Sequence, residues 1–152
     1  SPGNISDTAL DTNGKKIYLL ARNTGQYGET WRYNLQTNRW ENISSYPSPS
    51  PRYGDIAYDS INNIILLFGG SNGVSVSYND TWVYNISSGV WTQLFPIVSP
   101  PAGQMSESSL MEYLPQHNVF AVFREDGMWF YRYAAAPFDI ISPAAPTGLS
   151  VN

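Results

Sequence analysis

Residues 64–91, IILLFGGSNGVSVSYNDTWVYNISSGVW, decide the fold of this chain. They contain an apolar run that ends in two glycines, then the segment TWVYN, and then a second tryptophan, Trp91. A short continuous apolar run indicates a strand that is buried on both faces, whereas the alternation in TWVYN is typical of a strand with one buried face. The stretch therefore predicts antiparallel strands that are joined by turns.

Weaker copies of this segment lie on both sides of it. Trp31-Arg32-Tyr33-Asn34 runs on to Trp40, and Trp129-Phe130-Tyr131 runs on to Phe138. From Trp31 to Trp82 is 51 residues and from Trp82 to Trp129 is 47 residues, while the step from the tyrosine to the next aromatic is 7 residues in every copy. A period of this size is typical of repeated β units, as in a propeller.

The composition of the chain agrees with a soluble, β-rich protein. Of 152 residues, 42% are hydrophobic, 14% are aromatic and only 13% are charged, and twelve glycines and eleven prolines break the chain at short intervals. These values favour many short strands over long helices. A net charge of −4, with scattered Lys and Arg, argues against a nucleic-acid partner. The sequence has no apolar run of about 20 residues, so we expect no membrane insertion.

The expected strands follow from apolar patterning and turn residues. In the central unit they are 55–58, 64–68, 81–85 and 90–94, with Gly69-Gly70 stopping the second strand. In the first unit they are 8–10, 16–21, 29–34 and 39–43, with a type I′ turn at Asn13-Gly14. In the third unit they are 108–112, 119–123 and 128–132, followed by a fourth strand near Phe138 for which Ala134-Ala135-Ala136-Pro137 is poor material.

At these residues the chain resembles the kelch family of β-propellers. The family pattern is an apolar strand ending in Gly-Gly, then a spaced Tyr and Trp, with an Arg and a Gly opening the repeat. The middle unit supplies every part: Arg52, Gly54, Gly69-Gly70, Tyr84 and Trp91. The resemblance implies that the tyrosines and tryptophans pack between blades, namely Tyr33, Trp40, Tyr84 and Trp91.

The resemblance implies an all-β fold, a kelch-like β-propeller segment of about three four-stranded antiparallel blades. The blades would occupy residues 1–138, at about 4–46, 52–95 and 104–138, and residues 139–152 would be a Pro/Ala-rich linker or the start of a following fibronectin type III-like domain. Closed propellers have four to eight blades. We therefore expect the segment to be part of a larger propeller or assembly, completed by further blades, a second copy or another protein.

Candidate binding residues lie on the loops that join strands two and three and on the links between blades, because these emerge on the same side of antiparallel blades. They are Tyr27, Arg52, Tyr53, Asn72 and Tyr78, with Gln26, Tyr46 and 104–107 nearby. Tyr, Asn, Ser and Arg make an adaptable surface for a protein or glycan partner. Two plainer interpretations stay open: these are solvated loops, and Arg52 serves only to tie blades together.

The sequence gives little support for catalysis. The chain has one histidine, His117, in a turn, and no cysteine, whereas the galactose-oxidase-like copper proteins of this superfamily use two histidines and a Tyr-Cys link. Asp7 with Asp11, and Asp55 with Asp59, repeat at the same place in two units. This repetition favours a role as turn caps over a role as metal ligands. We expect no enzyme activity, no cofactor and no metal.

We interpret the chain as a non-catalytic extracellular recognition or assembly module that binds a protein or glycan through propeller loops. The candidate glycosylation sites, Asn4, Asn42, Asn79 and Asn85, support a secreted or cell-surface glycoprotein. Two alternatives stay open. The chain is an accessory propeller part of a secreted oxidase or glycan-active enzyme whose catalytic residues lie elsewhere, or a purely structural decoration of a larger surface assembly.

Overall fold

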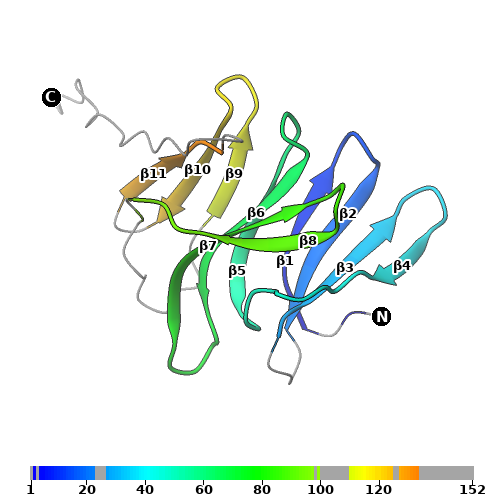
Figure 1. Ribbon diagram of the computed structural model, residues 1–152, viewed down its shortest axis with the longest axis horizontal. Coiled ribbons are helices and arrows are strands. Elements are labelled where there is room, and N and C mark those ends of the chain that lie inside the picture. The colour runs from blue at the N-terminus through cyan, green and yellow to red at the C-terminus, as the bar shows by residue number, and fades with distance from the viewer. Residues whose placement is uncertain are drawn as a thin grey trace, which may run out of the picture.

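The computed structural model describes residues 2, 4–22, 27–97, 99, 110–124 and 127–133. Within these residues the chain is all-β and forms three antiparallel sheets (Figure 1), two of four strands and one of three. The described part has no helix that is long and apolar enough to cross a membrane. The predicted fourth strand near Phe138 and the predicted linker or fibronectin-like segment at 139–152 lie outside the described residues.

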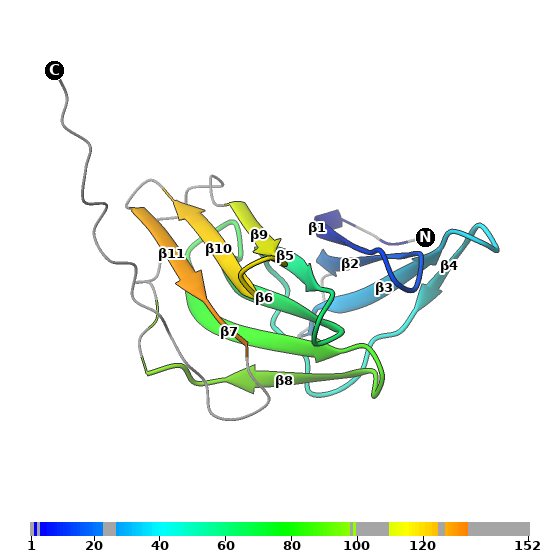
Figure 2. The ribbon, with the colours of Figure 1, turned by 90° about the horizontal axis from the view of Figure 1, so that it is seen from above.

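Each sheet is one blade, and its strands pair in chain order. Blade 1 contains β1 (Asn4–Asp11), β2 (Lys16–Arg22), β3 (Glu29–Asn34) and β4 (Arg39–Asn42). Blade 2 contains β5 (Tyr53–Asp59), β6 (Ile64–Ser71), β7 (Ser77–Asn85) and β8 (Val90–Leu94). Blade 3 contains β9 (Leu110–Leu114), β10 (Val119–Arg124) and β11 (Gly127–Tyr131). Figure 2 shows the three blades side by side in chain order.

The repeat predicted from the tryptophans is confirmed by strand register. Trp31, Trp82 and Trp129 all lie on the third strand of their blades, where they pair with Leu19, Leu67 and Val122 of the second strands. Residues 64–68 are all buried, as predicted for a strand covered on both faces. The main differences in length are that β1 begins at Asn4 and β7 begins at Ser77, each four residues earlier than expected.

The prediction that Gly69-Gly70 stops the second strand is wrong. Strand β6 continues to Ser71, and its register with β7 shifts between Phe68 and Gly70. The glycines have φ angles of 59° and 97°, values that side-chain-bearing residues rarely adopt. They therefore form a β-bulge that lets β6 and β7 extend as a hairpin beyond the blade.

The predicted type I′ turn at Asn13-Gly14 is also wrong. The positive φ falls on Lys15, at 52°, and the equivalent turns of the other blades place it on Asn63 and Asn118. The Oδ1 atom of Asp11 accepts a hydrogen bond of 2.7 Å from the amide of Gly14. This side-chain cap closes a longer, four-residue turn, in which the left-handed residue comes last.

The aspartates predicted as turn caps serve two purposes. Asp11 and Asp59 cap their turns, as expected, and Asp59 Oδ1 accepts from the amides of Ile61 and Asn62. Asp7 does not cap a turn, because its Oδ2 accepts a 2.8 Å hydrogen bond from the amide of Ile56 in the next blade. Burial raises the pKa of this carboxyl group. Asp7 therefore ties the innermost strands β1 and β5 together.

The core lies between the blades. We call the side of each sheet that carries the third-strand Tyr its front face, and the opposite side its back face. The front face of blade 2 packs against the back face of blade 1, in a cluster that includes Tyr84, Trp91, Ala9, Tyr18 and Leu20. The front face of blade 3 packs in the same way against the back face of blade 2. Every described inter-blade contact thus repeats one arrangement.

One hydrogen bond fixes the position of Trp91 in this core. Its indole Nε1 donates to Oγ1 of Thr30 in blade 1 over 2.7 Å, and both side chains are buried. The ring also lies 5.2 Å from the ring of Tyr84, which in turn contacts Tyr18 across the interface. The prediction that Tyr84 and Trp91 pack between blades is therefore confirmed. For Tyr33 and Trp40 it is not: no described blade covers them, and Trp40 is 38% exposed.

We expect Trp91→Ala to lower the free energy of unfolding by about 3–5 kcal/mol, because it leaves a cavity between blades and an unpaired Thr30 hydroxyl. The matched variant Trp40→Ala removes the same ring from the same position of blade 1 and should cost less than about 1 kcal/mol in this chain. Urea unfolding of both variants measures the difference. Equal losses would show that burial between blades is not what distinguishes the two tryptophans.

We expect Gly70→Ala to cost at least about 3 kcal/mol, because a Cβ there would lie 2.0 Å from the carbonyl oxygen of Tyr53 and the φ is 97°. Gly89→Ala is the control. Gly89 also has a positive φ, of 70°, but its added Cβ would come no closer than 3.6 Å to any neighbour. It should cost only about 1 kcal/mol, the strain alone. A Gly70 variant as stable as the Gly89 variant in thermal melts would refute the bulge argument.

Candidate binding surface at the loop end

The candidate surface lies at one end of the blades, which we call the loop end. It contains residues 27 and 28 before β3, the β4–β5 connection and the β6–β7 hairpin, whose tip lies at the lower edge of Figure 1. The opposite end carries the short turns 12–15, 60–63 and 115–118. Because the strands alternate in direction, these two ends separate the longer connections from the tight turns. The candidate residues Tyr27, Arg52, Tyr53, Asn72 and Tyr78 all belong to the loop end.

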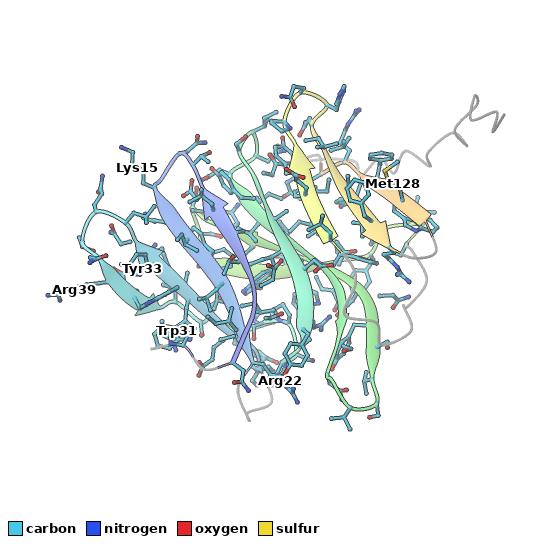
Figure 3. The ribbon with its side chains drawn as sticks, turned by 180° about the vertical axis from the view of Figure 1, so that it is seen from behind. Lys15, Arg22, Trp31, Tyr33, Arg39 and Met128 are labelled. Atoms are coloured by element: carbon cyan, nitrogen blue, oxygen red, sulfur yellow. The ribbon has the colours of Figure 1, made fainter. Side chains whose placement is uncertain are left out.

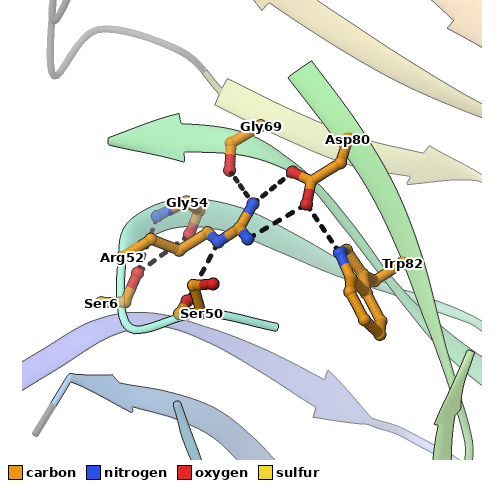
Figure 4. Close-up of polar contacts among 7 residues, drawn as sticks. All are labelled: Ser6, Ser50, Arg52, Gly54, Gly69, Asp80 and Trp82. Carbon is orange, nitrogen blue, oxygen red and sulfur yellow. Dashed lines mark hydrogen bonds and ion pairs between the residues drawn. The ribbon is translucent and has the colours of Figure 1, made fainter. Parts of the chain in front are cut away.

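Arg52 anchors the loop end from inside the molecule (Figure 4). Its residue is 1% exposed, and its guanidinium donates to the carbonyl oxygens of Ser50, at 3.0 Å, and Gly69, at 3.2 Å. The two terminal nitrogens bind the two carboxylate oxygens of Asp80 as a bidentate pair. Arg52 therefore joins the blade connection, the glycine bulge and the start of β7, and it does not line the surface as a free cation.

The carboxylate of Asp80 is shared by a second donor. Nε1 of Trp82 donates to its Oδ2 over 2.8 Å. Tyr78 completes the cluster, because the central carbon of the Arg52 guanidinium lies 3.8 Å from the centre of the Tyr78 ring. This distance is typical of a cation–π contact. The guanidinium thus holds Tyr78 in place at the base of the β6–β7 hairpin.

The tip of the β6–β7 hairpin is held by Asn72. Its Oδ1 accepts hydrogen bonds from the amides of Val74, Ser75 and Val76, at 2.9, 2.9 and 3.0 Å. The amide of Asn72 also donates to the carbonyl of Val76. The loop is therefore internally closed, and it holds Val74 in solvent with 71% of its surface exposed. The amide oxygen of Asn72 shapes the hairpin and is already occupied.

Tyr53 packs beneath the same hairpin. Its hydroxyl accepts a 3.0 Å hydrogen bond from Arg22, whose guanidinium carbon lies 5.1 Å from the centre of the Tyr53 ring. An added Cβ on Gly73 would meet the Tyr53 ring at 2.8 Å, so the hairpin backbone lies directly against it. Arg22, which the sequence did not single out as a binding residue, thus comes together with the predicted Tyr53.

Tyr27 and Tyr46 form a second, exposed group. Their rings meet edge to face at 5.1 Å, and Tyr46 is 74% exposed. A hydrogen bond with Tyr46 raises the pKa of the Tyr27 hydroxyl. Two aromatic rings that stand in solvent with polar tips are typical of a recognition surface, because they offer large contact areas at a low entropic cost.

Several exposed apolar residues at this end were not proposed from the sequence. Phe95 and Ile97 follow the end of β8 and are among the most exposed apolar residues described. Single exposed apolar side chains look ordinary in a sequence, and only the strand directions place these two at the loop end. The predicted neighbours Gln26 and 104–107 lie outside the described residues.

The remaining sequence candidates lie elsewhere or stay predictions. His117 is exposed in the turn 115–118, at the opposite end, as expected for a turn residue. The sequon asparagines Asn4, Asn42, Asn79 and Asn85 are all exposed. Within the described residues, no group of three or more His, Cys, Asp or Glu side chains is placed to hold a metal ion.

Comparison with known proteins agrees with this geometry. Residues 55–94, which form most of blade 2, match the Kelch motif. The fold is part of a β-propeller, and its central blade is a kelch repeat. The chain is similar to Kelch domain-containing protein 10 of Xenopus tropicalis, with 28% identity over an alignment 103 residues long that covers 59% of this chain and 24% of that protein. The human protein of that name is 31% identical over an alignment 91 residues long, which covers 54% of this chain and 20% of that protein.

The chain thus spans about a quarter of the length of the curated relatives it matches. A solved structure, TolB from Acinetobacter baumannii, superposes with a TM-score of 0.56 at 14% identity, covering 90% of this chain and 31% of TolB. At that identity the likeness supports the propeller fold alone. Further kelch blades are therefore the expected neighbours of the three blades in this chain.

We expect Arg52→Ala to destabilise the chain by about 3 kcal/mol, because Asp80 would keep its charge beside Trp82 without its cation. Arg22→Ala is the matched control and should cost about 1 kcal/mol, because Arg22 contributes a hydrogen bond and a stacked contact to Tyr53 at a half-buried position. Urea unfolding measures both. The double variant Arg52→Ala/Asp80→Ala should lose less free energy of unfolding than the sum of the two single variants, and less than Arg52→Ala alone. Losses that simply add would contradict the pairing.

Proposed function

We propose that the chain is a non-catalytic recognition module of an extracellular protein, and that the loop end binds a protein partner. The observation that carries this proposal is the β6–β7 hairpin, which stands beyond the blade and is held by Arg52 at its base and Asn72 at its tip. A hairpin fixed in this way presents Val74 and Val76 to a partner without a large loss of loop entropy on binding. The exposed Tyr27–Tyr46 pair adds aromatic contact area.

A protein is favoured over a glycan by the chemistry of the exposed side chains. Val74, Val76, Phe95 and Ile97 are apolar and exposed at this end. Val74 and Val76 lie together in the hairpin, and exposed apolar side chains that are grouped in this way mark protein interfaces. A glycan would instead need many free polar groups, but the amide oxygen of Asn72 and the guanidinium of Arg52 are already engaged.

The proposed extracellular setting rests on the sequence and on exposure. Four sequon asparagines, Asn4, Asn42, Asn79 and Asn85, are accessible to solvent. Expression of the full-length protein in eukaryotic cells, followed by treatment with a peptide N-glycosidase, tests this. A shift in electrophoretic mobility of the secreted protein supports it. Retention of an unglycosylated protein in the cytosol would overturn it.

The loop-end assignment is tested with two matched surface variants. Tyr46→Ser/Val74→Ser changes exposed residues of the loop end, and Leu35→Ser/Ile61→Ser changes exposed apolar residues in turns of the opposite end. Proteins captured on the wild-type chain are identified, purified and titrated against all three forms. We expect the loop-end variant to bind at least about tenfold more weakly and the opposite-end variant to bind normally. Weaker binding by the opposite-end variant, with normal binding by the loop-end variant, would refute the assignment of the partner site to the loop end.

A further inference from the structure

The side-chain amide of Asn72, at the tip of the β6–β7 hairpin, is surrounded by backbone donors. Its Oδ1 accepts hydrogen bonds from the amides of Val74, Ser75 and Val76, at 2.9, 2.9 and 3.0 Å. These bonds draw electron density from the side-chain carbonyl carbon towards the oxygen. Gly73, the next residue in the chain, is exposed and has a φ of 74°. The tip thus places a polarised carbonyl group beside a backbone amide that no side chain hinders.

An asparagine that precedes a glycine can lose its side-chain nitrogen in a reaction that needs only water. The backbone nitrogen of Gly73 gives up its proton to water and forms a bond to Cγ of Asn72, and the negative charge of the tetrahedral intermediate collects on Oδ1. The bond between Cγ and Nδ2 then breaks, and the nitrogen leaves as ammonia with a proton from water. Water opens the resulting cyclic imide at one of its two carbonyl carbons. The product at this position is either an aspartate or an isoaspartate.

The hairpin supplies the donors that this reaction requires. Backbone N–H groups that point at the atom on which negative charge develops stabilise the transition state, as in an oxyanion hole. Three such groups are already within hydrogen-bond distance of Oδ1 of Asn72, so none has to be reorganised. The amide of Gly73 donates to the hydroxyl of Ser71 over 3.2 Å, a neutral acceptor at the long end of the usual range. This bond holds the proton of Gly73 weakly.

A second Asn-Gly pair, Asn13-Gly14 in blade 1, is held in the opposite way. The amide of Gly14 donates to the carboxylate of Asp11 over 2.7 Å, a charge-assisted bond. Loss of the Gly14 proton would place a negative charge next to that carboxylate. The Nδ2 atom of Asn13, which would have to leave, donates to the carbonyl oxygen of Ser60 over 3.2 Å. Folding therefore opposes the same reaction at Asn13.

We propose that Asn72 is a site of spontaneous deamidation that remains reactive in the folded chain, whereas Asn13 is protected. An aspartate formed at position 72 keeps the three amide donors as charge-assisted bonds and adds one negative charge beside Val74 and Val76. An isoaspartate lengthens the backbone by one methylene directly after Ser71, which pairs with Ser77. Both products change the hairpin tip.

The chemical step is tested without any partner. The folded chain and the chain in concentrated urea are incubated at mildly alkaline pH, and peptide mapping by mass spectrometry follows aspartate and isoaspartate at both Asn-Gly pairs over time. In the folded chain we expect Asn72 to react at least about tenfold faster than Asn13, because the three donors are in place. In urea the two rates should agree within about threefold, because no tertiary contact then distinguishes the sites.

Two outcomes would overturn the proposal. One is a ratio of the two rates that is no larger in the folded chain than in urea, because folding would then not distinguish the sites. The other is a rate at Asn72 that is lower in the folded chain than in urea, because the hairpin would then hinder the reaction.

The effect on binding rests on the proposed function of the loop end, and matched charge variants test it. Asn72→Asp adds a negative charge at the loop end, and Asn13→Asp adds the same charge at the opposite end. Figure 3 shows these two ends, with Lys15 in the turn that contains Asn13 and Arg22 next to the hairpin backbone. We expect Asn72→Asp to bind the purified partner at least about threefold more weakly, because an added carboxylate must lose water in the interface. Asn13→Asp should bind normally.

The two proposals fail in different ways. Normal binding by Asn72→Asp, together with weaker binding by Tyr46→Ser/Val74→Ser, would overturn the effect of deamidation on binding and leave the loop end as the partner site. Normal binding by all of these variants would overturn the loop-end assignment itself. The rates measured by mass spectrometry do not depend on either result.

Discussion

The contact between the front face of one blade and the back face of the previous blade is the interaction on which the rest of the structure depends. A single four-stranded sheet cannot bury both of its apolar faces, so β6, whose residues 64–68 are all apolar and buried, requires a neighbour on each side. Blade 2 has both neighbours, and its residues form the centre of both hydrophobic clusters. The outer blades each have one described neighbour, and the faces that no described blade covers carry the exposed Trp40 and Phe123.

Polar contacts set the alignment of this apolar stack. The carboxylate of Asp7 and the hydroxyl of Ser6 bind backbone groups of β5, and Thr30 binds the indole of Trp91. Burial between sheets is non-directional and would tolerate sliding, whereas these hydrogen bonds have defined partners. The innermost and outer strands of neighbouring blades are therefore fixed relative to each other, and the connections between blades emerge together at the loop end.

At the loop end, too, some side chains fix the structure through polar contacts and others supply the contact surface. The residues proposed from the sequence do come together there, but only some of them face solvent. Arg52 and Asn72 are occupied by internal hydrogen bonds and give the hairpin its shape, while Tyr27, Tyr46 and Val74 supply the exposed surface. A sequence lists residue types that can bind a partner, and it does not say which of their polar atoms are already engaged. That information is in the side-chain contacts.

The sequence by itself determined the repeat, the strand order and the blade aromatics, because a period of about 50 residues and the constant Tyr-to-aromatic step are local patterns. It could not show that Gly69-Gly70 forms a bulge, that Asp7 reaches the next blade or that Arg52 is buried. Each of these features depends on a partner far away in the sequence. The glycine bulge depends on the pairing with Tyr78, Asp7 on the amide of Ile56, and Arg52 on the carboxylate of Asp80. Tertiary structure alone decided that Trp91 is buried and Trp40 exposed, although both follow a tyrosine by 7 residues. The physical reason is the facing blade. Blade 1 faces Trp91 and supplies Thr30 as its hydrogen-bond acceptor, whereas none of the described blades faces Trp40.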